Sequence, residues 1–236
     1  ANKSSTVMSM GEHQGSGFDS SANNQMKASN PQPMAGQPTA FAQVVHLPES
    51  YWVFNFTRGP AEWNCPYAYQ IGRYDEVRPG MYTAPLFGGE RDLHVGIDIG
   101  APAGTEVHSF ADGVIHSFGI NDEAGSYGPT IVVEHQLSWP PTSNNQHAVR
   151  PVWALYGHLS TESLDALEVG QPVQKGALLA TMGTKDENGG WEPHVHFQLS
   201  LVEPKNPDLP GVVHRDDREQ ALRDYPDPRL VLGRLY

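Results

Sequence analysis

The chain is poor in cysteine, in basic residues and in long apolar runs. Its 236 residues include one cysteine, Cys65, which excludes an intrachain disulfide and a structural zinc site built from cysteines. Acidic residues (27) outnumber Lys and Arg (15), and the net charge of −12 argues against a general nucleic-acid binder, because phosphates must be neutralised by cations. No apolar run approaches the ~20 residues of a membrane span, and no signal peptide is visible. The single cysteine and the acidic balance therefore argue against a disulfide-stabilised protein and against a general nucleic-acid binder.

Glycine and proline, by contrast, are abundant. There are 24 Gly and 20 Pro, and with frequent Val, Thr and aromatic residues they predict many short strands joined by turns. Residues 1–40 are rich in Ser, Asn, Gln and Gly, which predicts a disordered leader. Short helices are expected only in 161–167 and 216–225. The pattern is that of an all-β protein with little helix.

Local patterns add four expectations about strands and turns. Residues 51–56 resemble a strand, and residues 63–74 resemble a loop that leads into the rest of the chain. Ala111, Asp112 and Gly113 separate two strand-like runs, which predicts a hairpin. The stretch 104–115 is weakly echoed by 170–179 in its spacing of Gly, Val and hydrophobic residues, which suggests two related β-motifs packed together.

Two histidine motifs about a hundred residues apart carry most of the chemical information. They are His94-x-x-x-Asp98 and His194-Val-His196, and His158 stands between them. Two histidines and a carboxylate, with a fourth position open, form a recurrent zinc site of hydrolases. The set holds more histidines than one such site needs, so at least one is available for proton transfer. The remaining histidines belong to no such motif and are expected to be surface or hydrogen-bonded residues.

Strand alternation places these residues on defined faces. His194, His196 and Gln198 share one face of their strand, while the apolar residues between them face the core. A straight strand would separate His94 from Asp98 by ~13 Å. Both reach one metal only if the chain bends between them, and Gly96 is the residue that permits the bend.

These motifs give the chain a family resemblance. It runs through HVGIDI, APAGTEV, ADGVI, LYGHLS, VGQPVQKGALLATMG and EPHVHFQL, over roughly residues 91–203. The region resembles the lysostaphin-type zinc metalloendopeptidases, which cleave stem peptides or cross-links of bacterial peptidoglycan. The resemblance implies a mainly antiparallel β-sheet or sandwich, with a duplicated hybrid motif and an open substrate groove. It also implies an extracytoplasmic location.

The resemblance further implies roles for individual residues. Zinc would be held by His94, Asp98 and His196, and His194 and His158 would be unligated catalytic histidines. A neutral imidazole can take a proton from water, and its cation can protonate the leaving amine. We expect His194 to be the principal base, although the sequence does not divide the roles between the two. No HExxH motif is present, so the glutamate-based mechanism of that motif is not available.

Three polar loops are expected to wall the groove: 119–129, 138–151 and 183–193. Tyr127 and Trp191 are candidate substrate-facing aromatics within them. Loops of this kind set the shape of a cleft and therefore its substrate preference.

The expected domain order is a leader (1–40), an N-terminal extension packed on the catalytic domain (41–90), the catalytic domain (91–203) and a C-terminal extension (204–236).

Three alternatives compete with the wall peptidase. A non-catalytic wall-binding or regulatory module is disfavoured by the complete set of five residues. A sugar-transport phosphocarrier domain is disfavoured by Asp98. A metallopeptidase acting on peptides outside the wall stays open.

Overall fold

The structure is a computed structural model that describes residues 28–29, 40–59, 65–141 and 148–236. The predicted leader, residues 1–40, lies outside the described residues except for its positions 28, 29 and 40. In the described part of the chain, no helix is long and apolar enough to cross a membrane.

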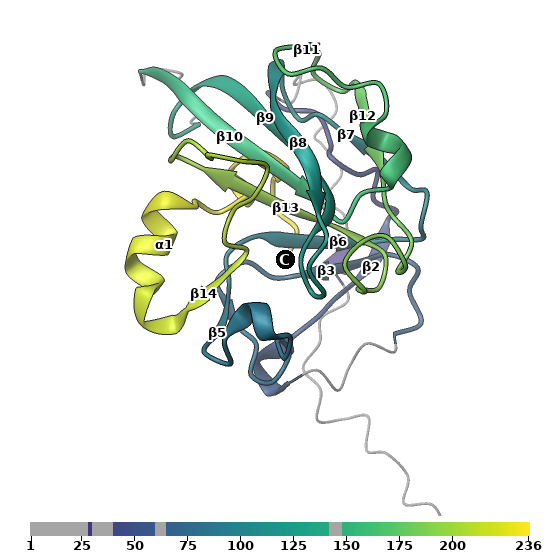
Figure 1. The fold of residues 1–236 in the computed structure, drawn as a ribbon, viewed down its shortest axis with the longest axis vertical. Coiled ribbons are helices and arrows are strands. Elements are labelled where there is room, and N and C mark those ends of the chain that lie inside the picture. The colour runs from purple at the N-terminus through teal and green to yellow at the C-terminus, as the bar shows by residue number, and fades with distance from the viewer. Residues whose placement is uncertain (1–27, 30–39, 60–64, 142–147) are drawn as a thin grey trace, which may run out of the picture.

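The described residues form one large sheet of nine strands (Figure 1). In spatial order they are β1 (Ala28–Ser29), β2 (Ser50–Val53), β3 (Gln70–Gly72), β6 (Ile97–Gly100), β13 (His194–Ser200), β10 (Val149–Gly157), β9 (Gly128–Ser138), β8 (Gly113–Asn121) and β11 (Pro172–Val173). Neighbouring strands are antiparallel, except that β2 and β3 are parallel. The prediction of a mainly β, largely antiparallel fold is confirmed.

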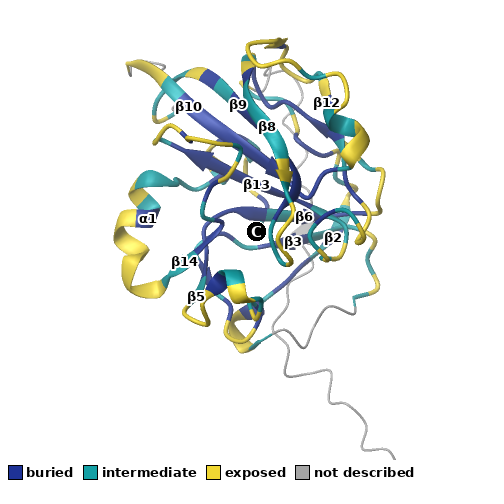
Figure 2. Cartoon of the chain, viewed as in Figure 1, coloured by how far each residue is buried: buried dark blue, intermediate teal, exposed yellow. Residues whose placement is uncertain are grey.

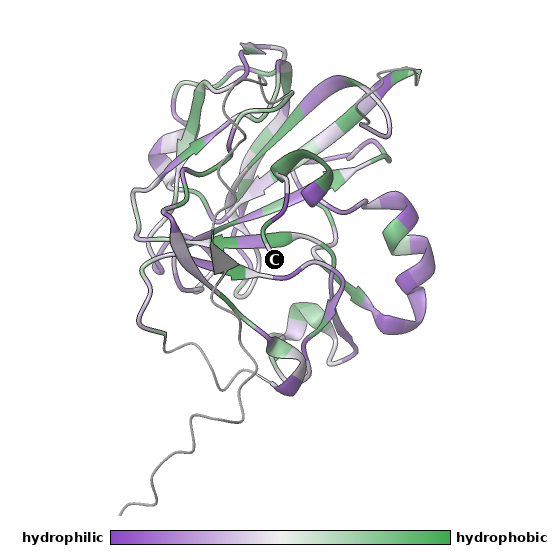
Figure 3. Cartoon of the chain, turned by 180° about the vertical axis from the view of Figure 1, so that it is seen from behind, coloured by the Kyte–Doolittle hydropathy of each residue, from purple (hydrophilic) through white to green (hydrophobic). Residues whose placement is uncertain are grey.

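Two smaller sheets and a few short helices complete the described fold. One sheet pairs β7 (Glu106–His108) with β12 (Leu178–Thr181), and the other has the order β14 (Val212–His214), β5 (Arg91–His94), β4 (Glu76–Val77). The helices are η1 (Phe56–Arg58), η2 (Pro85–Phe87), η3 (Thr161–Leu164), η4 (Arg215–Asp217), α1 (Arg218–Asp224) and α2 (Arg229–Leu232). Helix α1 is largely hydrophilic, and it packs on the rest of the chain through the buried Ala221 (Figure 3).

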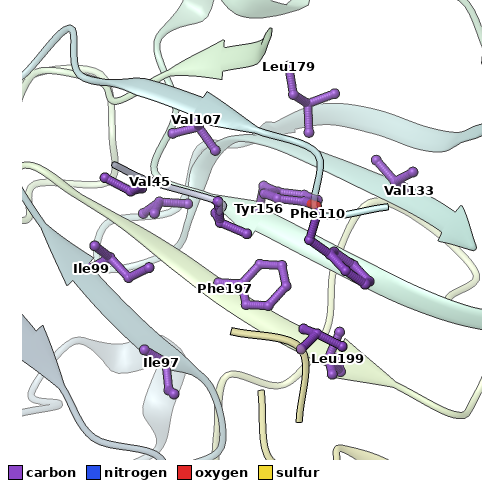
Figure 4. Close-up of a cluster of buried hydrophobic side chains, with 14 of the residues drawn as sticks. Val45, Ile97, Ile99, Val107, Phe110, Val133, Tyr156, Leu179, Phe197 and Leu199 are labelled. Atoms are coloured by element: carbon purple, nitrogen blue, oxygen red, sulfur yellow. The ribbon is translucent and has the colours of Figure 1, made fainter. Parts of the chain in front are cut away.

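The larger hydrophobic core lies on one face of the central strands, as their alternation predicts. Val195, Phe197 and Leu199 of β13 are fully buried and pack with Ile97 and Ile99 of β6 (Figure 4). Each such side chain contributes roughly 1.5–3 kcal/mol through burial. Figure 2 shows the buried residues concentrated along these strands, with exposed residues in the loops and on α1. The core therefore fixes which face of β13 carries the histidines.

The predicted hairpin at Ala111–Gly113 is wrong, whereas the predicted packing of the two echoed motifs is confirmed. In the described structure β7 pairs with β12, and β8 pairs with β9 and β11, so the turn joins two sheets. The first motif, 104–115, contains β7 and the start of β8. The second, 170–179, contains β11 and the start of β12. Each motif thus pairs both of its strands with those of the other.

The chain changes sheets between His94 and Asp98, which produces the predicted bend. Strand β5 ends at His94 in the three-stranded sheet, and β6 begins at Ile97 in the nine-stranded sheet. Gly96 is not among the glycines with a positive φ, so the bend itself does not require glycine; glycine is needed here because a Cβ would overlap the ring of His196. The loop predicted for 63–74 is wrong at its end, where β3 pairs with β6.

Candidate active site

Three side chains from three strands meet where β6 and β13 pair. His94 ends β5, Asp98 lies in β6, and His196 lies opposite Asp98 in β13. The Nε2 of His94 is 3.1 Å from Oδ1 of Asp98 and 3.1 Å from Nδ1 of His196, and that Nδ1 is 3.0 Å from the same oxygen. Among the described residues this is the one group of three or more His, Cys, Asp or Glu side chains whose ligand atoms converge in this way.

The protons of the two imidazoles point away from this meeting point. Nδ1 of His94 lies 2.8 Å from the carbonyl oxygen of Arg73, and Nε2 of His196 lies 3.0 Å from Oε1 of Gln198. Both oxygens can only accept, so each of these nitrogens donates its hydrogen. The opposite nitrogens are left with lone pairs that face the Asp98 carboxylate. Three electron-pair donors without a proton between them fit a cation, and two imidazoles with one carboxylate suit zinc.

Burial and charge favour the ligand forms of these groups. Burial lowers the pKa of His94 to about 4, and the nearby Arg78 cation adds to the effect. Burial alone would raise the pKa of Asp98, but His94 and Arg78 together hold it well below its usual range. At neutral pH the site therefore contains a neutral imidazole and an ionised carboxylate, the forms that bind metal.

Two further histidines face the same hollow. His158 follows β10 with φ 63°, a conformation that residues other than glycine seldom adopt, and His194 begins β13. Each donates its Nδ1 hydrogen to a backbone carbonyl, that of Asn188 at 2.7 Å and that of Glu192 at 2.6 Å. Their ring centroids are 4.2 Å apart, and Nε2 of His194 is 3.8 Å from Oδ1 of Asp98. Both rings thus present an unprotonated Nε2.

Burial lowers the pKa of both rings. The pKa of His158 lies well below the ordinary histidine value, through burial first and the neighbouring His194 second. Burial likewise lowers the pKa of His194. Each is therefore neutral near pH 7 and able to accept a proton.

The five residues line a hollow of about 530 Å³. A second hollow of about 660 Å³ shares Asp98, Trp191 and His194 with the first. The two hollows therefore meet at the histidine cluster, as the halves of a groove would.

Two of the three expected loops line these hollows. The loop 119–129 borders the first hollow, and 183–193 borders both. The expectation for 138–151 is wrong for its described residues, none of which lines either hollow; residues 142–147 lie outside the description. This loop joins β9 to the start of β10, whereas His158 follows the end of β10. A nine-residue strand, roughly 30 Å long, separates them.

The two candidate aromatics have different surroundings. Tyr127 is buried, donates its hydroxyl hydrogen to the carbonyl of Leu209 at 3.0 Å, and packs its ring against those of His158 and His196. Trp191 is half-buried, borders both hollows and donates from Nε1 to the carbonyl of Gly125 at 3.1 Å. Of the two, Trp191 has the position expected of a substrate contact. Of the histidines that were given no catalytic or ligand role, His13 and His147 lie outside the described residues. None of the described ones lines either hollow.

Several contacts of the site come from residues to which the sequence reasoning gave no role. Arg78 and Tyr82 precede β5, and Gln198 anchors His196. The segment 208–212 covers the histidine face of β13, and the Nε2 of Gln198 donates to the carbonyl of Pro210. The alternation of β13 did place Gln198 beside the histidines, which is the one signal that marked it. No comparable signal in the sequence marked Arg78.

Comparison with known proteins yields both solved structures and curated relatives. The catalytic domain of lysostaphin from Staphylococcus simulans aligns at 20% identity and TM-score 0.41, over 65% of this chain and 92% of its own. The catalytic domain of the prophage-encoded M23 protein EnpA from Enterococcus faecalis aligns at 23% identity and TM-score 0.40, over 67% and 95%.

The curated relatives are similar over the part of the chain that holds the site. The DD-carboxypeptidase/endopeptidase Mpg of Neisseria meningitidis is 32% identical over 116 residues, which are 49% of this chain and 22% of that protein. The protein of the same name from Neisseria gonorrhoeae matches equally. The chain thus spans less than a quarter of the length of these relatives. The sequence model of peptidase family M23 matches residues 92–207, which include all five site residues. Residues 92–207 of this chain therefore form a domain of peptidase family M23.

Proposed function

We propose that the chain is a zinc-dependent endopeptidase that hydrolyses peptide bonds in peptidoglycan stem peptides or cross-links. The observation that carries the proposal is the meeting of three unprotonated ligand atoms, on His94, Asp98 and His196, beside two neutral histidines in one groove. The name of the Neisseria relatives, DD-carboxypeptidase/endopeptidase, supports a peptide substrate. Because peptidoglycan lies outside the cytoplasm, we propose an extracytoplasmic location as well.

In this proposal His94, Asp98 and His196 hold the zinc. When bound, zinc is a Lewis acid that polarises a carbonyl and makes water more acidic. His194 accepts the proton of the attacking water at Nε2, since its Nδ1 hydrogen is already committed to the carbonyl of Glu192. The same nitrogen then returns the proton to the leaving amine. His158, whose Nδ1 hydrogen is committed to the carbonyl of Asn188, accepts a hydrogen bond from the attacking water at its own Nε2.

The proposal includes a division of the chain, which the contacts of the two extensions support. We propose 91–203 as the catalytic domain, with 41–90 and 204–236 as extensions that complete it, and 1–40 as a tether. Strands β2 and β3 of the first extension belong to the nine-stranded sheet, and the segment 208–212 of the second borders the groove. Trp191 is proposed as a substrate contact at the point where the two hollows join.

Digestion of purified sacculi with the full chain, followed by mass analysis of the released muropeptides, tests the proposal. We expect new amine and carboxyl ends, loss of activity with a zinc chelator, and recovery on adding zinc. A panel of sacculi from several wall types, together with unrelated peptides, identifies the bond and separates a wall enzyme from a general peptidase. Binding to sacculi without any new ends would instead indicate a non-catalytic wall-binding module.

Substitutions separate the two kinds of histidine. His94→Ala and His196→Ala are expected to abolish both metal binding and cleavage. His194→Ala and His158→Ala are expected to abolish cleavage while the protein retains about one zinc per chain. Loss of zinc from His194→Ala in a folded protein would contradict the proposed roles.

A further inference from the structure

Arg78 is buried beside the expected zinc ligand Asp98, and its hydrogen bonds fix its plane. Its side chain is 3% exposed. Nη1 donates to Oδ2 of Asp98 at 2.7 Å and to the hydroxyl of Tyr82 at 2.9 Å. Nε donates to Oε2 of Glu76 at 3.0 Å, and Nη2 donates to the carbonyl of Arg73 at 3.1 Å. A guanidinium held on four sides cannot turn away from Asp98 without breaking several bonds.

The two oxygens of the Asp98 carboxylate consequently face different partners. Oδ1 lies near Nε2 of His94 and Nδ1 of His196, where the three ligand atoms meet. Oδ2 accepts a hydrogen bond from Nη1 of Arg78. A carboxylate can bind a metal through one oxygen or through both, and here one of the two is already committed to a cation.

Glu76 supplies the charge balance that such an arrangement requires. An arginine alone would neutralise Asp98 and repel a divalent cation a few ångströms away. The carboxylate of Glu76 is buried against Arg78 and also accepts the backbone hydrogen of Phe56 at 3.1 Å. The three charged groups together carry one net negative charge, so the site keeps its attraction for a cation.

The segment from Arg73 to Arg78 contacts two of the three expected ligands. The carbonyl of Arg73 accepts both from Nδ1 of His94 and from Nη2 of Arg78, and Arg78 in turn donates to Asp98. This segment precedes the part of the chain that matches the peptidase family, which begins at residue 92.

We propose that Arg78, balanced by Glu76, is a positioning residue that reserves Oδ2 of Asp98, so that this ligand offers the metal a single oxygen. A metal held by one atom from each of the three side chains would keep a coordination position free for water or substrate. This inference rests on the proposed function, because it assumes that Asp98 ligates the metal.

Cobalt(II) substituted for zinc provides a spectroscopic readout of metal coordination. This readout would not change if Arg78 only stabilised the fold. Four-coordinate cobalt absorbs visible light more strongly than five- or six-coordinate cobalt, so its spectrum reports whether Oδ2 has joined the metal. The main variant is Glu76→Gln with Arg78→Met, which removes both charges together, so that neither Glu76 nor Arg78 is left buried without the other. We expect a folded protein with weaker cobalt absorption. The kcat should fall about 10–100-fold, with little change in KM.

The control is Arg218→Met, which breaks an exposed ion pair with Asp75 inside the same segment. It should leave the spectrum and kcat unchanged. If the double variant does not fold, Arg78→Lys carries the test, because lysine keeps the charge but not the planar fork, and it should shift the spectrum in the same direction. A folded variant with the spectrum and kcat of the parent protein would overturn the inference. If the parent protein itself binds neither cobalt nor zinc, the proposed function fails first, and the inference fails with it.

Discussion

Substitution of Gly72 by alanine tests how tightly the site is packed behind Asp98. Gly72 pairs with Asp98 across β3 and β6. A Cβ on Gly72 would lie 2.7 Å from Oδ2 of Asp98 and 2.8 Å from Nη2 of Arg78. Ordinary contacts of a Cβ begin at 3.4 Å, so one group must move by about 0.7 Å.

Neither neighbour can move without cost. Asp98 accepts a hydrogen bond from Arg78, and Arg78 is itself held by four acceptors. Inserting a methyl group into such a place costs about 1–3 kcal/mol. A displaced Asp98 also no longer meets the two imidazole nitrogens. We therefore expect Gly72→Ala to lower the free energy of unfolding by that amount and to weaken zinc binding at least about tenfold.

Zinc titration against a competing chelator measures the affinity, and denaturant unfolding of the metal-free protein measures the stability. Gly119→Ala is the matched control, since it lies in strand β8 and its added Cβ would meet a single neighbour, the Cγ of Pro207 at 3.1 Å. It should bind zinc as the parent protein does. Parental zinc affinity in a folded Gly72→Ala protein would refute the reasoning that Asp98 is fixed from behind.

Three other predictions concern separate parts of the structure. His135 is fully buried, and burial lowers its pKa to about 4. Below pH 6.5 the unfolded chain takes up a proton that the folded chain does not. The free energy of unfolding should therefore fall by up to about 3 kcal/mol between pH 6.5 and 4. His135→Phe should flatten this part of a denaturant-versus-pH profile, and an unchanged slope would contradict the assignment. Gln198→Leu removes the acceptor that orients His196 and should weaken zinc binding about 10–100-fold in the same titration. Gly211→Ala would place a methyl group on the Tyr127 hydroxyl and cost about 1–3 kcal/mol, and Tyr127→Phe should recover part of that loss; no recovery would point to another cause.

Features that depend on near neighbours in the chain could be predicted from the sequence. The period of two along β13 correctly separated the core residues Val195, Phe197 and Leu199 from the histidine face. The distance between His94 and Asp98 along a straight strand required a bend, and the chain indeed changes sheets there. These inferences hold because strand geometry is the same wherever the strand lies.

Features that depend on distant partners were missed. The turn at Ala111–Gly113 has the composition of a hairpin, but β7 finds its partner in β12, about seventy residues later in the chain. A turn sequence sets only the local path of the chain. The partner of a strand is the segment that the rest of the fold places beside its free edge, and for β7 that segment is β12. The loop 138–151 was assigned to the groove for its polarity, which says nothing about the end of β10 at which it lies.

The supporting residues of the site illustrate the same limit more sharply. The histidine motifs name atoms able to bind a metal, but an imidazole has two nitrogens, and only a second contact decides which one keeps the proton. For His94 that contact is the carbonyl of Arg73, and any residue type offers a carbonyl, so no side-chain pattern could have marked it. Arg78 is one of fifteen cations in the chain, and what distinguishes it is burial between Glu76 and Asp98. The motif therefore names the candidate ligands, while the segment that contacts them is identified only once the strands have been brought together.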